Sequence, residues 1–223
     1  PVSEFQGFFG LMPAYTGSLG AKLVTFYPNN RGVPTHHALI VLFHPETGAP
    51  SAVMDGRLIT ELRTAAASAT ATQALARPDA SILAILGSGV QAGSHLEALR
   101  LVRPIGEVRV WSPHTADVFA ARHKVTAAAS AEAAVRGADI IVVATSSTTP
   151  VLEGRWISAG AHINAVGATR PDWRELDDEV LARSRLFVDS REASQQESGD
   201  VIAAGRIEAE IGEVLGGSAE GRR

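Results

Sequence analysis

The stretch ASILAILGSGVQAGSHLEALR, residues 80–100, decides the fold of this chain. An apolar run leads into Gly87 and Gly89, Ala92 takes the third small position of a G-x-G-x-x-G/A turn, and a helix is predicted from about 89 to 101. Gly87 permits a tight turn, Gly89 lets a pyrophosphate approach the backbone, and Ala92 lets the helix pack close to the strand. The N–H groups that begin the helix would bind the anion. The alternative is a tight turn of another α/β protein, and we favour a dinucleotide because a second strand follows at the right distance.

Strands and helices alternate from this turn onward. The predicted strands are 81–86, 107–111, 139–144, 161–166 and 185–189, and further helices are predicted at 115–123 and 130–136. Strands that alternate with helices predict an α/β fold with a Rossmann-type, doubly wound parallel sheet.

The residues ahead of the turn follow another pattern. Runs of β-branched and aromatic residues at 21–27, 38–43 and 51–54 predict antiparallel strands, and the alanine-rich segment 59–75 predicts a helix with a small face. Because residues 1–15 begin within an apparent strand and the chain ends in a polar tail, we expect this domain to be truncated at both chain ends. The predicted domains are a partial dimerisation and substrate domain at 1–77, a dinucleotide-binding domain at 78–205, and the start of a return to the first domain, or a tail, at 206–223.

The composition limits the classes of function. The 223 residues are 45% hydrophobic and 20% charged, which is typical of a soluble globular protein. A net charge of −4 gives no basic surface for nucleic acid. There is no cysteine, no His, Asp or Glu grouping with metal-ligand spacing and no G-x-S-x-G motif, which argues against thiolate, metal and serine-hydrolase chemistry. No apolar stretch could span a membrane and no signal peptide is visible, so we expect a cytoplasmic protein without a membrane partner.

The end of the second strand bears on the choice of cofactor. An Asp or Glu usually follows that strand and binds the ribose 2′-hydroxyl of NAD, but this sequence reads WSPHT at 111–115. Ser112, His114 and Thr115 can donate hydrogen bonds to a 2′-phosphate, so NADPH is favoured although no Arg is present, and NADH remains possible. The alternative is that Ser112 and His114 are ordinary polar loop residues. Thr145 and Ser146 follow a later strand at the edge where open α/β sheets bind ligands.

Several phrases together resemble the ornithine cyclodeaminase/mu-crystallin family. They are MPAY (12–15), KLVTFYPNNRGVPTHHA (22–38), AVMDG (52–56), ITELRTAAASA (59–69), LGSGVQA (86–92), GAHINAVGATRPDWRELD (160–177) and ESGDV (197–201). The resemblance covers nearly the whole chain and is closest to the mu-crystallin, or ketimine reductase, branch. It implies a homodimer in which a substrate domain accompanies a Rossmann domain and a nicotinamide cofactor acts on small amino or imino acids.

The resemblance also implies roles for individual residues. Lys22 and Arg63 match residues that hold the substrate carboxylate, and Glu197 lies in a segment that reaches the active site. The residues implied at the cofactor are Thr35 and His36 on the nicotinamide side, Arg63 and Thr64 nearby, Gly87, Gly89, Val90 and Gln91 at the pyrophosphate, and Thr145, Ser146 and Val166 along the rest of the nucleotide.

Thr169 separates two branches of the family. The resemblance implies an aspartate there in ornithine cyclodeaminases, where it serves ring closure, and a small hydroxyl residue in ketimine reductases. Thr169 therefore favours the reductase. An arginine that the family places just upstream of Pro1 and a C-terminal helix are absent from the sequence, which puts substrate affinity and dimerisation in doubt.

The charges suit a cyclic ketimine carboxylate. The planar guanidinium of Arg63 can bind a carboxylate through two hydrogen bonds, and Lys22 can share that carboxylate or supply a proton, of which we favour the first. Both could instead be surface charges. His36 could be catalytic or structural, and we interpret His37 as solvated. We interpret the cluster Asp172, Arg174, Glu175 and Asp177 as helix capping, and Glu197 and Asp200 could be a capping pair.

The leading hypothesis is an NAD(P)H-dependent reductase of cyclic ketimines such as pyrroline- or piperideine-2-carboxylate. The alternatives are an alanine dehydrogenase, an ornithine cyclodeaminase with tightly held NAD, and a cofactor-dependent binder of thyroid hormone without turnover.

Overall fold

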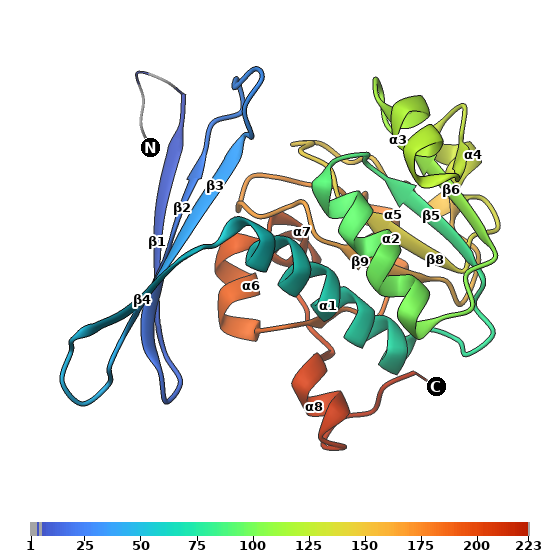
Figure 1. Cartoon of the computed structure of the whole chain (residues 1–223). Helices are drawn as coiled ribbons and strands as arrows, with labels where there is room; N and C mark the ends of the chain where they lie inside the picture. The colour runs from blue at the N-terminus through green and yellow to red at the C-terminus, as the bar shows by residue number, and fades with distance from the viewer. Residues whose placement is uncertain (1–3, 5, 223) are drawn as a thin grey trace. The chain divides into compact units, whose positions relative to one another are not determined.

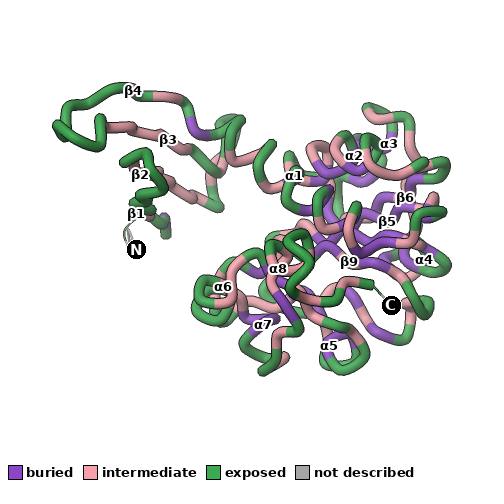
Figure 2. The backbone as a smooth tube through the Cα atoms, turned by 90° about the horizontal axis from the view of Figure 1, so that it is seen from below, coloured by how far each residue is buried: buried purple, intermediate pink, exposed green. Residues whose placement is uncertain are grey.

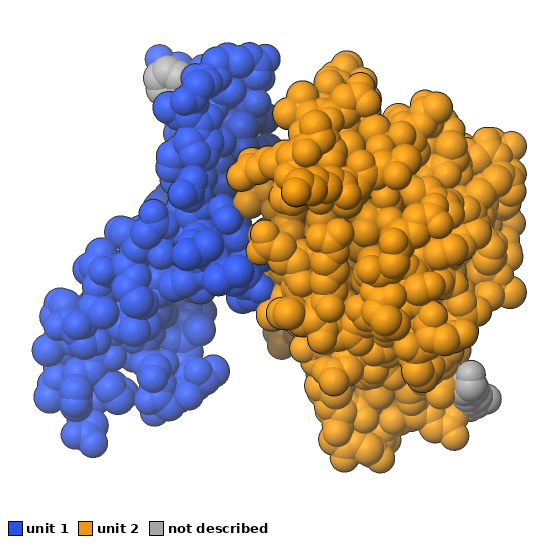
Figure 3. All heavy atoms as spheres, turned by 45° about the vertical axis from the view of Figure 1, so that its right-hand side comes forward, with its two compact units in different colours: residues 1–63 blue, residues 64–223 orange. Residues whose placement is uncertain are grey.

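The protein is described by a computed structural model that covers residue 4 and residues 6–222. The chain forms two compact units, unit 1 up to Arg63 and unit 2 from Thr64 onward (Figures 1 and 3). The order of elements is antiparallel strands, one long helix and then alternating strands and helices, which confirms the predicted fold class.

Unit 1 is built on a four-stranded antiparallel sheet. The strands run in sequence order as β1 (Phe8–Tyr15), β2 (Leu19–Phe26), β3 (His36–Phe43) and β4 (Pro50–Asp55). The register places Lys22 between Met12 and Ile40, and Phe26 beside His36. Because side chains alternate across a strand, Lys22 and His36 share one face.

The opposite face of this sheet is apolar and open. We call it the apolar sheet face, and its exposed members are Phe9, Leu11, Tyr15, Leu19, Leu39 and Val53. Leu11 and Val53 are 63% and 64% exposed, far from the usual state of a core residue. In Figure 2, the strands of unit 1 are intermediate or exposed along their length, whereas the strands of unit 2 contain many buried residues.

Helix α1 (Arg57–Leu75) connects the sheet of unit 1 to unit 2. Its first turns expose Leu58 and Leu62, whereas its second half buries small residues, among them Ala65 and Ala69. The two compact units therefore divide inside the helix, between Arg63 and Thr64, and the domain boundary at 77/78 stays a prediction. The physical reason is that the small face packs on unit 2 and makes this half of the helix part of it.

Unit 2 contains a five-stranded parallel sheet in the order β7-β6-β5-β8-β9. Its strands are β5 (Ile82–Leu86), β6 (Glu107–Trp111), β7 (Thr126–Ala127), β8 (Ile140–Val143) and β9 (His162–Ala165). The chain starts at the central strand, builds one side and then returns to build the other, which is the doubly wound topology.

Each face of this sheet carries its own apolar core. Leu83 and Ile85 of β5 point to one side, where α2 (Val90–Val102) and α3 (Ala116–His123) pack together with α1. Ala84 and Leu86 point to the other side, against α4 (Ala131–Val135) and α5 (Asp178–Arg183). The continuous apolar run of β5 is thus explained by burial on both faces.

The strand predicted at 185–189 is shorter than expected and does not belong to the five-stranded sheet. Only β10 (Phe187–Val188) forms there, and it pairs in parallel with β11 (Ala209–Glu210) in a separate two-stranded sheet. The remaining helices are α6 (Arg191–Glu197), α7 (Gly199–Ala204) and α8 (Ile211–Leu215). The last segment lies on unit 2, since Arg222 donates to the carbonyl oxygens of Leu75 at 3.0 Å and Gly160 at 2.8 Å.

A chain of buried hydrogen bonds links β9 to α1 and α2. His162 donates to Asn164 at 3.2 Å, and Asn164 donates to the hydroxyl of Thr72 at 3.0 Å. One turn away, Ser68 donates to Nε2 of His95 at 2.9 Å, and Nδ1 of His95 donates to a carbonyl oxygen of α2 at 2.7 Å. These bonds satisfy polar groups that would otherwise be costly to bury.

Both buried histidines favour the neutral form. Loss of water on burial lowers the pKa of His95, and it lowers the pKa of His162 to about 4, with Arg222 and Arg103 adding to the second shift. His162 is protonated more easily in the unfolded chain than in the folded one. Its neutral form therefore contributes fully to folding stability above pH 6.5, and this contribution is lost as the pH falls toward 4.

We therefore expect the free energy of unfolding to fall by about 2 kcal/mol between about pH 7.5 and about pH 5 because of His162. Urea denaturation at the two pH values measures this difference. His162→Gln should reduce the loss, whereas the same change at the exposed His114 should leave it unchanged. Equal stability of the parent chain at both pH values would contradict the prediction.

Candidate functional site

The strand order makes the adjacent strands β5 and β8 the switch point of the sheet. Their connections leave in opposite directions, and open α/β sheets bind ligands beyond the carboxyl ends of the strands at such a point. Gly87 follows β5, donates to the carbonyl oxygen of Trp111 at 2.8 Å and has φ +108. A Cβ atom on Gly87 would collide with the carbonyl of Ala144. Only glycine therefore allows the turn to lie this close to the end of β8.

Gly89 has a different reason to be glycine. Its backbone is extended (φ −81, ψ −169), it caps α2 without a side-chain hydrogen bond, and a Cβ atom would meet nothing within 4 Å. Beside it, Val90 is exposed and Gln91 is half-buried. The first N–H groups of α2 have no partner within the helix, so this open turn can cradle an anion such as a pyrophosphate.

Hydroxyl groups gather at the end of β6. Ser88 donates to Ser112 at 2.8 Å and lies 2.5 Å from the hydroxyl oxygen of Thr115, whose N–H donates to Ser112 at 3.2 Å. These bonds connect the glycine turn to the WSPHT segment. A cavity of about 380 Å³ lies here, lined in part by Ser112, His114 and Asp117. Ser88 is not among the residues predicted at the cofactor, although it lies inside the glycine turn.

Thr145 and Gly167 begin the loops that follow β8 and β9, and Glu175 holds both. The fully buried carboxylate of Glu175 accepts from the N–H of Thr145 at 2.7 Å, from its hydroxyl at 2.5 Å, and from the N–H of Gly167 at 2.7 Å. Burial raises the pKa of Glu175, and these hydrogen bonds oppose the rise. The interpretation of Glu175 as a capping residue is therefore wrong, because its side chain turns inward to the sheet.

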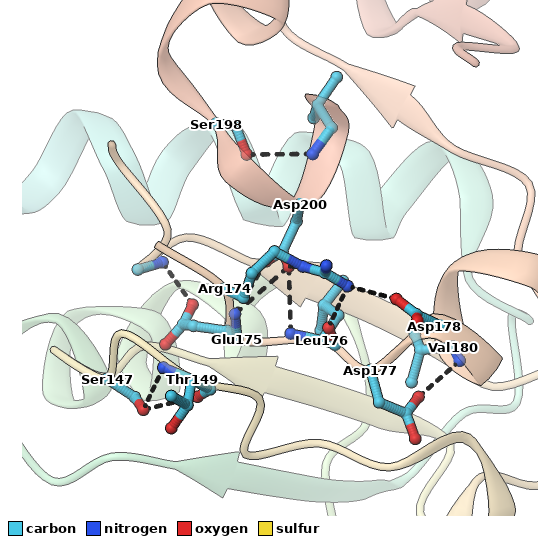
Figure 4. A network of polar contacts seen from close by, with 12 residues as sticks. Ser147, Thr149, Arg174, Glu175, Leu176, Asp177, Asp178, Val180, Ser198 and Asp200 are labelled. Atoms are coloured by element: carbon cyan, nitrogen blue, oxygen red, sulfur yellow. Dashed lines mark hydrogen bonds and ion pairs between the residues drawn. The ribbon is translucent and has the colours of Figure 1, made fainter. Parts of the chain in front are cut away.

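Asp200 holds the backbone of Glu175 through hydrogen bonds. Its buried carboxylate accepts from the N–H groups of Glu175 and Leu176 and from Nε of Arg174 at 3.0 Å (Figure 4). Ser198 is the residue that caps α7, so Asp200 does not form the predicted capping pair with Glu197. Asp177 does cap α5, as predicted, by accepting from Val180 at 2.8 Å.

Of the other predicted residues of unit 2, two were expected at the cofactor and two in catalysis. The cofactor pair, Ser146 and Val166, lies just beyond β8 and β9, at the carboxyl edge of the sheet. Thr169 is exposed in the loop that Glu175 anchors. Glu197 is exposed at the last residue of α6, and its predicted role in catalysis stays a prediction.

Unit 1 holds two of the four predicted catalytic residues, Lys22 and Arg63, and the two residues predicted on the nicotinamide side, Thr35 and His36. Lys22 is half-buried in the middle of β2, and Arg63 is exposed on α1, next to Thr64 in sequence. Thr35 precedes β3, and His36 stacks on Phe26 with ring centroids 4.4 Å apart. Partial loss of water and the neighbouring His37 lower the pKa of His36, which favours a neutral ring.

The chemical groups at the carboxyl edge of the parallel sheet suit the binding of an anionic ligand. The described residues bring no three His, Asp or Glu side chains together as metal ligands. Among the helices that the structure describes, none has the length and apolar character needed to cross a membrane. An anion cradle, a cavity lined in part by Ser112 and His114, and two loops held by a buried carboxylate fit an extended dinucleotide.

Comparisons with known proteins give the same result. The sequence profile of the ornithine cyclodeaminase/mu-crystallin family matches residues 1–223. The Mus musculus protein named ketimine reductase mu-crystallin is 50% identical over 228 residues, which cover 98% of this chain and 73% of that protein. The solved Thermococcus litoralis Delta(1)-pyrroline-2-carboxylate reductase, in complex with NADH and L-proline, is 40% identical with a TM-score of 0.92 and covers 100% of this chain and 75% of its own. An archaeal alanine dehydrogenase dimer with bound NAD is 38% identical with a TM-score of 0.91, covering 98% and 73%.

The two glycines of the turn should respond differently to alanine. Gly87→Ala forces a side chain into positive φ and against Ala144, so we expect a loss of about 2 kcal/mol or more of folding stability. Gly89→Ala should cost less than about 1 kcal/mol. It should nevertheless weaken NAD(P)H binding about tenfold, because its methyl group occupies the space that a pyrophosphate needs.

Thermal unfolding and a fluorescence titration with NADPH and NADH measure both effects. Parent-like affinity in Gly89→Ala, or parent-like stability in Gly87→Ala, would contradict this account of the turn.

Proposed function

Because this chain belongs to the ornithine cyclodeaminase/mu-crystallin family, we propose that it reduces the C=N bond of a cyclic imino acid to the cyclic amino acid. The chain is an NAD(P)H-dependent oxidoreductase, and substrates of the pyrroline- or piperideine-2-carboxylate type are our proposal. The observation that carries it is the match of 98–100% of this chain to 73–75% of relatives named for reduction of a ketimine or of Delta(1)-pyrroline-2-carboxylate.

The residues of unit 2 fit the cofactor. When bound, NAD(P)H supplies the hydride that reduces the imine carbon. The turn at Gly87 and Gly89 and the first N–H groups of α2 would hold the pyrophosphate, and the loops at Thr145 and Gly167 would border the rest of the nucleotide. Support for this assignment comes from the open space at Gly89, where a Cβ atom would meet nothing.

The residues of unit 1 suit the substrate. Arg63 would bind the carboxylate through both arms of its planar guanidinium. Lys22 would share that carboxylate and add a second positive charge. A protonated C=N carbon accepts hydride readily, so holding the ring in place is the main task of these side chains. Thr169, in place of the aspartate that ring closure would need, supports reduction over cyclodeamination.

We propose NADPH as the preferred cofactor. The segment after β6 offers the hydroxyls of Ser112 and Thr115 and the ring of His114, and no acidic residue occurs among 111–115. Ser112, His114 and Thr115 can donate hydrogen bonds to a 2′-phosphate, whereas the carboxylate of Asp117, which also lines the cavity, opposes its binding.

We also propose that the chain forms a homodimer through the apolar sheet face. Leu11, Tyr15 and Val53 are 63%, 69% and 64% exposed on this face, and exposed apolar side chains gathered on one face are typical of an interaction surface. A second copy of the same face would cover it with matching apolar side chains. The archaeal alanine dehydrogenase, which is described as a dimer, supports the proposed oligomeric state.

The reductase proposal is tested by following NADPH oxidation with and without a five- or six-membered cyclic ketimine carboxylate, and again with NADH. We expect imine-dependent oxidation that is faster with NADPH. Arg63→Ala should lower kcat/KM by about 100-fold, because the substrate carboxylate loses its bidentate partner. Arg57→Ala on the same helix, which pairs with Glu61, is the matched control and should keep parent activity. An NADPH-bound chain that oxidises no NADPH with either ring would exclude the proposed reaction.

The homodimer is tested by sedimentation analysis. The parent chain should sediment at twice its chain mass, and Leu11→Glu should shift it to a monomer because a charge is then buried in the interface. Leu101→Glu places the same charge on α2, where the side chain is 87% exposed, and should leave the dimer intact. A monomeric parent chain would contradict the proposal.

A further inference from the structure

We propose that Glu175 is a positioning residue for the dinucleotide, because its buried carboxylate ties together the loops after β8 and β9 and fixes the gap between them. This inference rests on the proposed function, since it assumes that these loops receive the cofactor. It assigns to Glu175 a role in cofactor affinity in addition to its role in the fold.

The position of Glu175 continues the sheet beyond its last ladder bond. The ladder between β8 and β9 reaches Val166, whose N–H donates to Val143 at 2.9 Å. Beyond this bond, Oε2 accepts from Gly167, one residue after Val166, and Oε1 accepts from Thr145, two residues after Val143. A single carboxylate thus joins the two backbones just past the end of the ladder.

Both the backbone N–H and the hydroxyl of Thr145 make hydrogen bonds within this arrangement. Its hydroxyl donates to Glu175 at 2.5 Å and accepts from the N–H of Ser147 at 3.0 Å, and its own N–H also donates to Glu175. Its side chain therefore shapes the loop that leads to Ser146. We infer that any contribution of Thr145 to cofactor binding depends on where Glu175 holds it.

Gly167 shows that the approach of the carboxylate is close. A Cβ atom at this position would collide with Oε1 of Glu175 and with the carbonyl oxygen of Thr145. Glycine is needed there so that the carboxylate can reach both loops. The loop that begins at Gly167 also carries Thr169, so the same contact orients a residue predicted at the substrate.

The carboxylate itself is held in place from the opposite side. Asp200 accepts from the backbone N–H groups of Glu175 and Leu176, and Leu176 forms a parallel bridge with Leu152. Gly199, next to Asp200, fits against the carbonyl oxygen of Trp173, where a Cβ atom would collide. These contacts fix the backbone of Glu175 independently of the hydrogen bonds that its side chain makes to the loops. A residue that positions other groups needs to be held in this way by its own neighbours.

The test is the dissociation constant of NADPH, measured by fluorescence titration without any imine substrate. In Glu175→Gln the shape is kept, but one oxygen becomes an NH₂ group that cannot accept from Thr145 or Gly167. We expect the dissociation constant to rise about tenfold or more in the folded variant, because displaced loops bind less well.

Leu99→Ala separates positioning from general destabilisation. Leu99 is fully buried near the end of α2, so its truncation weakens the fold while leaving Glu175 and both loops unchanged. Parent affinity in Leu99→Ala together with weakened binding in Glu175→Gln supports the inference. Glu132→Gln makes the same chemical change at an exposed carboxylate on α4 and should also bind like the parent.

Glu175→Asp keeps the charge but is one methylene shorter, so it cannot span both loops, and it replaces Glu175→Gln if that variant does not fold. Parent affinity in a folded Glu175→Gln or Glu175→Asp chain overturns the inference. A parent chain that binds NADPH but reduces no imine would disprove the proposed reaction alone, because the positioning role is judged from dissociation constants only.

Discussion

The close approach of β5 to β8 at Gly87 is the constraint on which unit 2 depends. Both strands are buried on both faces, so their side chains fill two cores and leave no freedom to separate them. Gly87 turns the chain away from β5 against the carbonyl of Ala144, and this turn starts α2 at the edge where the sheet opens. The anion cradle is therefore a consequence of how two central strands pack.

Buried polar groups complete the same edge of the sheet. Glu175 and Asp200 are taken out of water, and each is satisfied by several N–H or O–H donors. A buried carboxylate with its donors in place fixes geometry more strictly than an apolar contact, because hydrogen bonds are directional and an unmade one is costly. The segments WRELD and ESGDV are therefore in contact through Glu175 and Asp200, and together they hold the loops that follow β8 and β9.

Unit 1 divides its chemistry between two faces of one sheet. Lys22 and His36 lie on one face, while Leu11, Tyr15 and Val53 lie on the other. The alternation of side chains along each strand makes this separation possible within eight-residue strands. In the proposed function, one face serves the substrate and the other a second copy of the chain.

The sequence by itself determined the glycine turn, the parallel sheet and the placement of Thr145 and Ser146 at its edge, because turn chemistry and apolar periodicity are local properties. Only the tertiary structure decided the role of Glu175, whose partner Thr145 lies 30 residues away, and the separate pairing of β10 with β11. Neither a lone carboxylate nor a two-residue strand carries a periodic signal, so a contact between distant segments had to assign them. For the same reason the unit boundary fell inside α1, where packing of the small face counts for more than the Pro-containing segment after it.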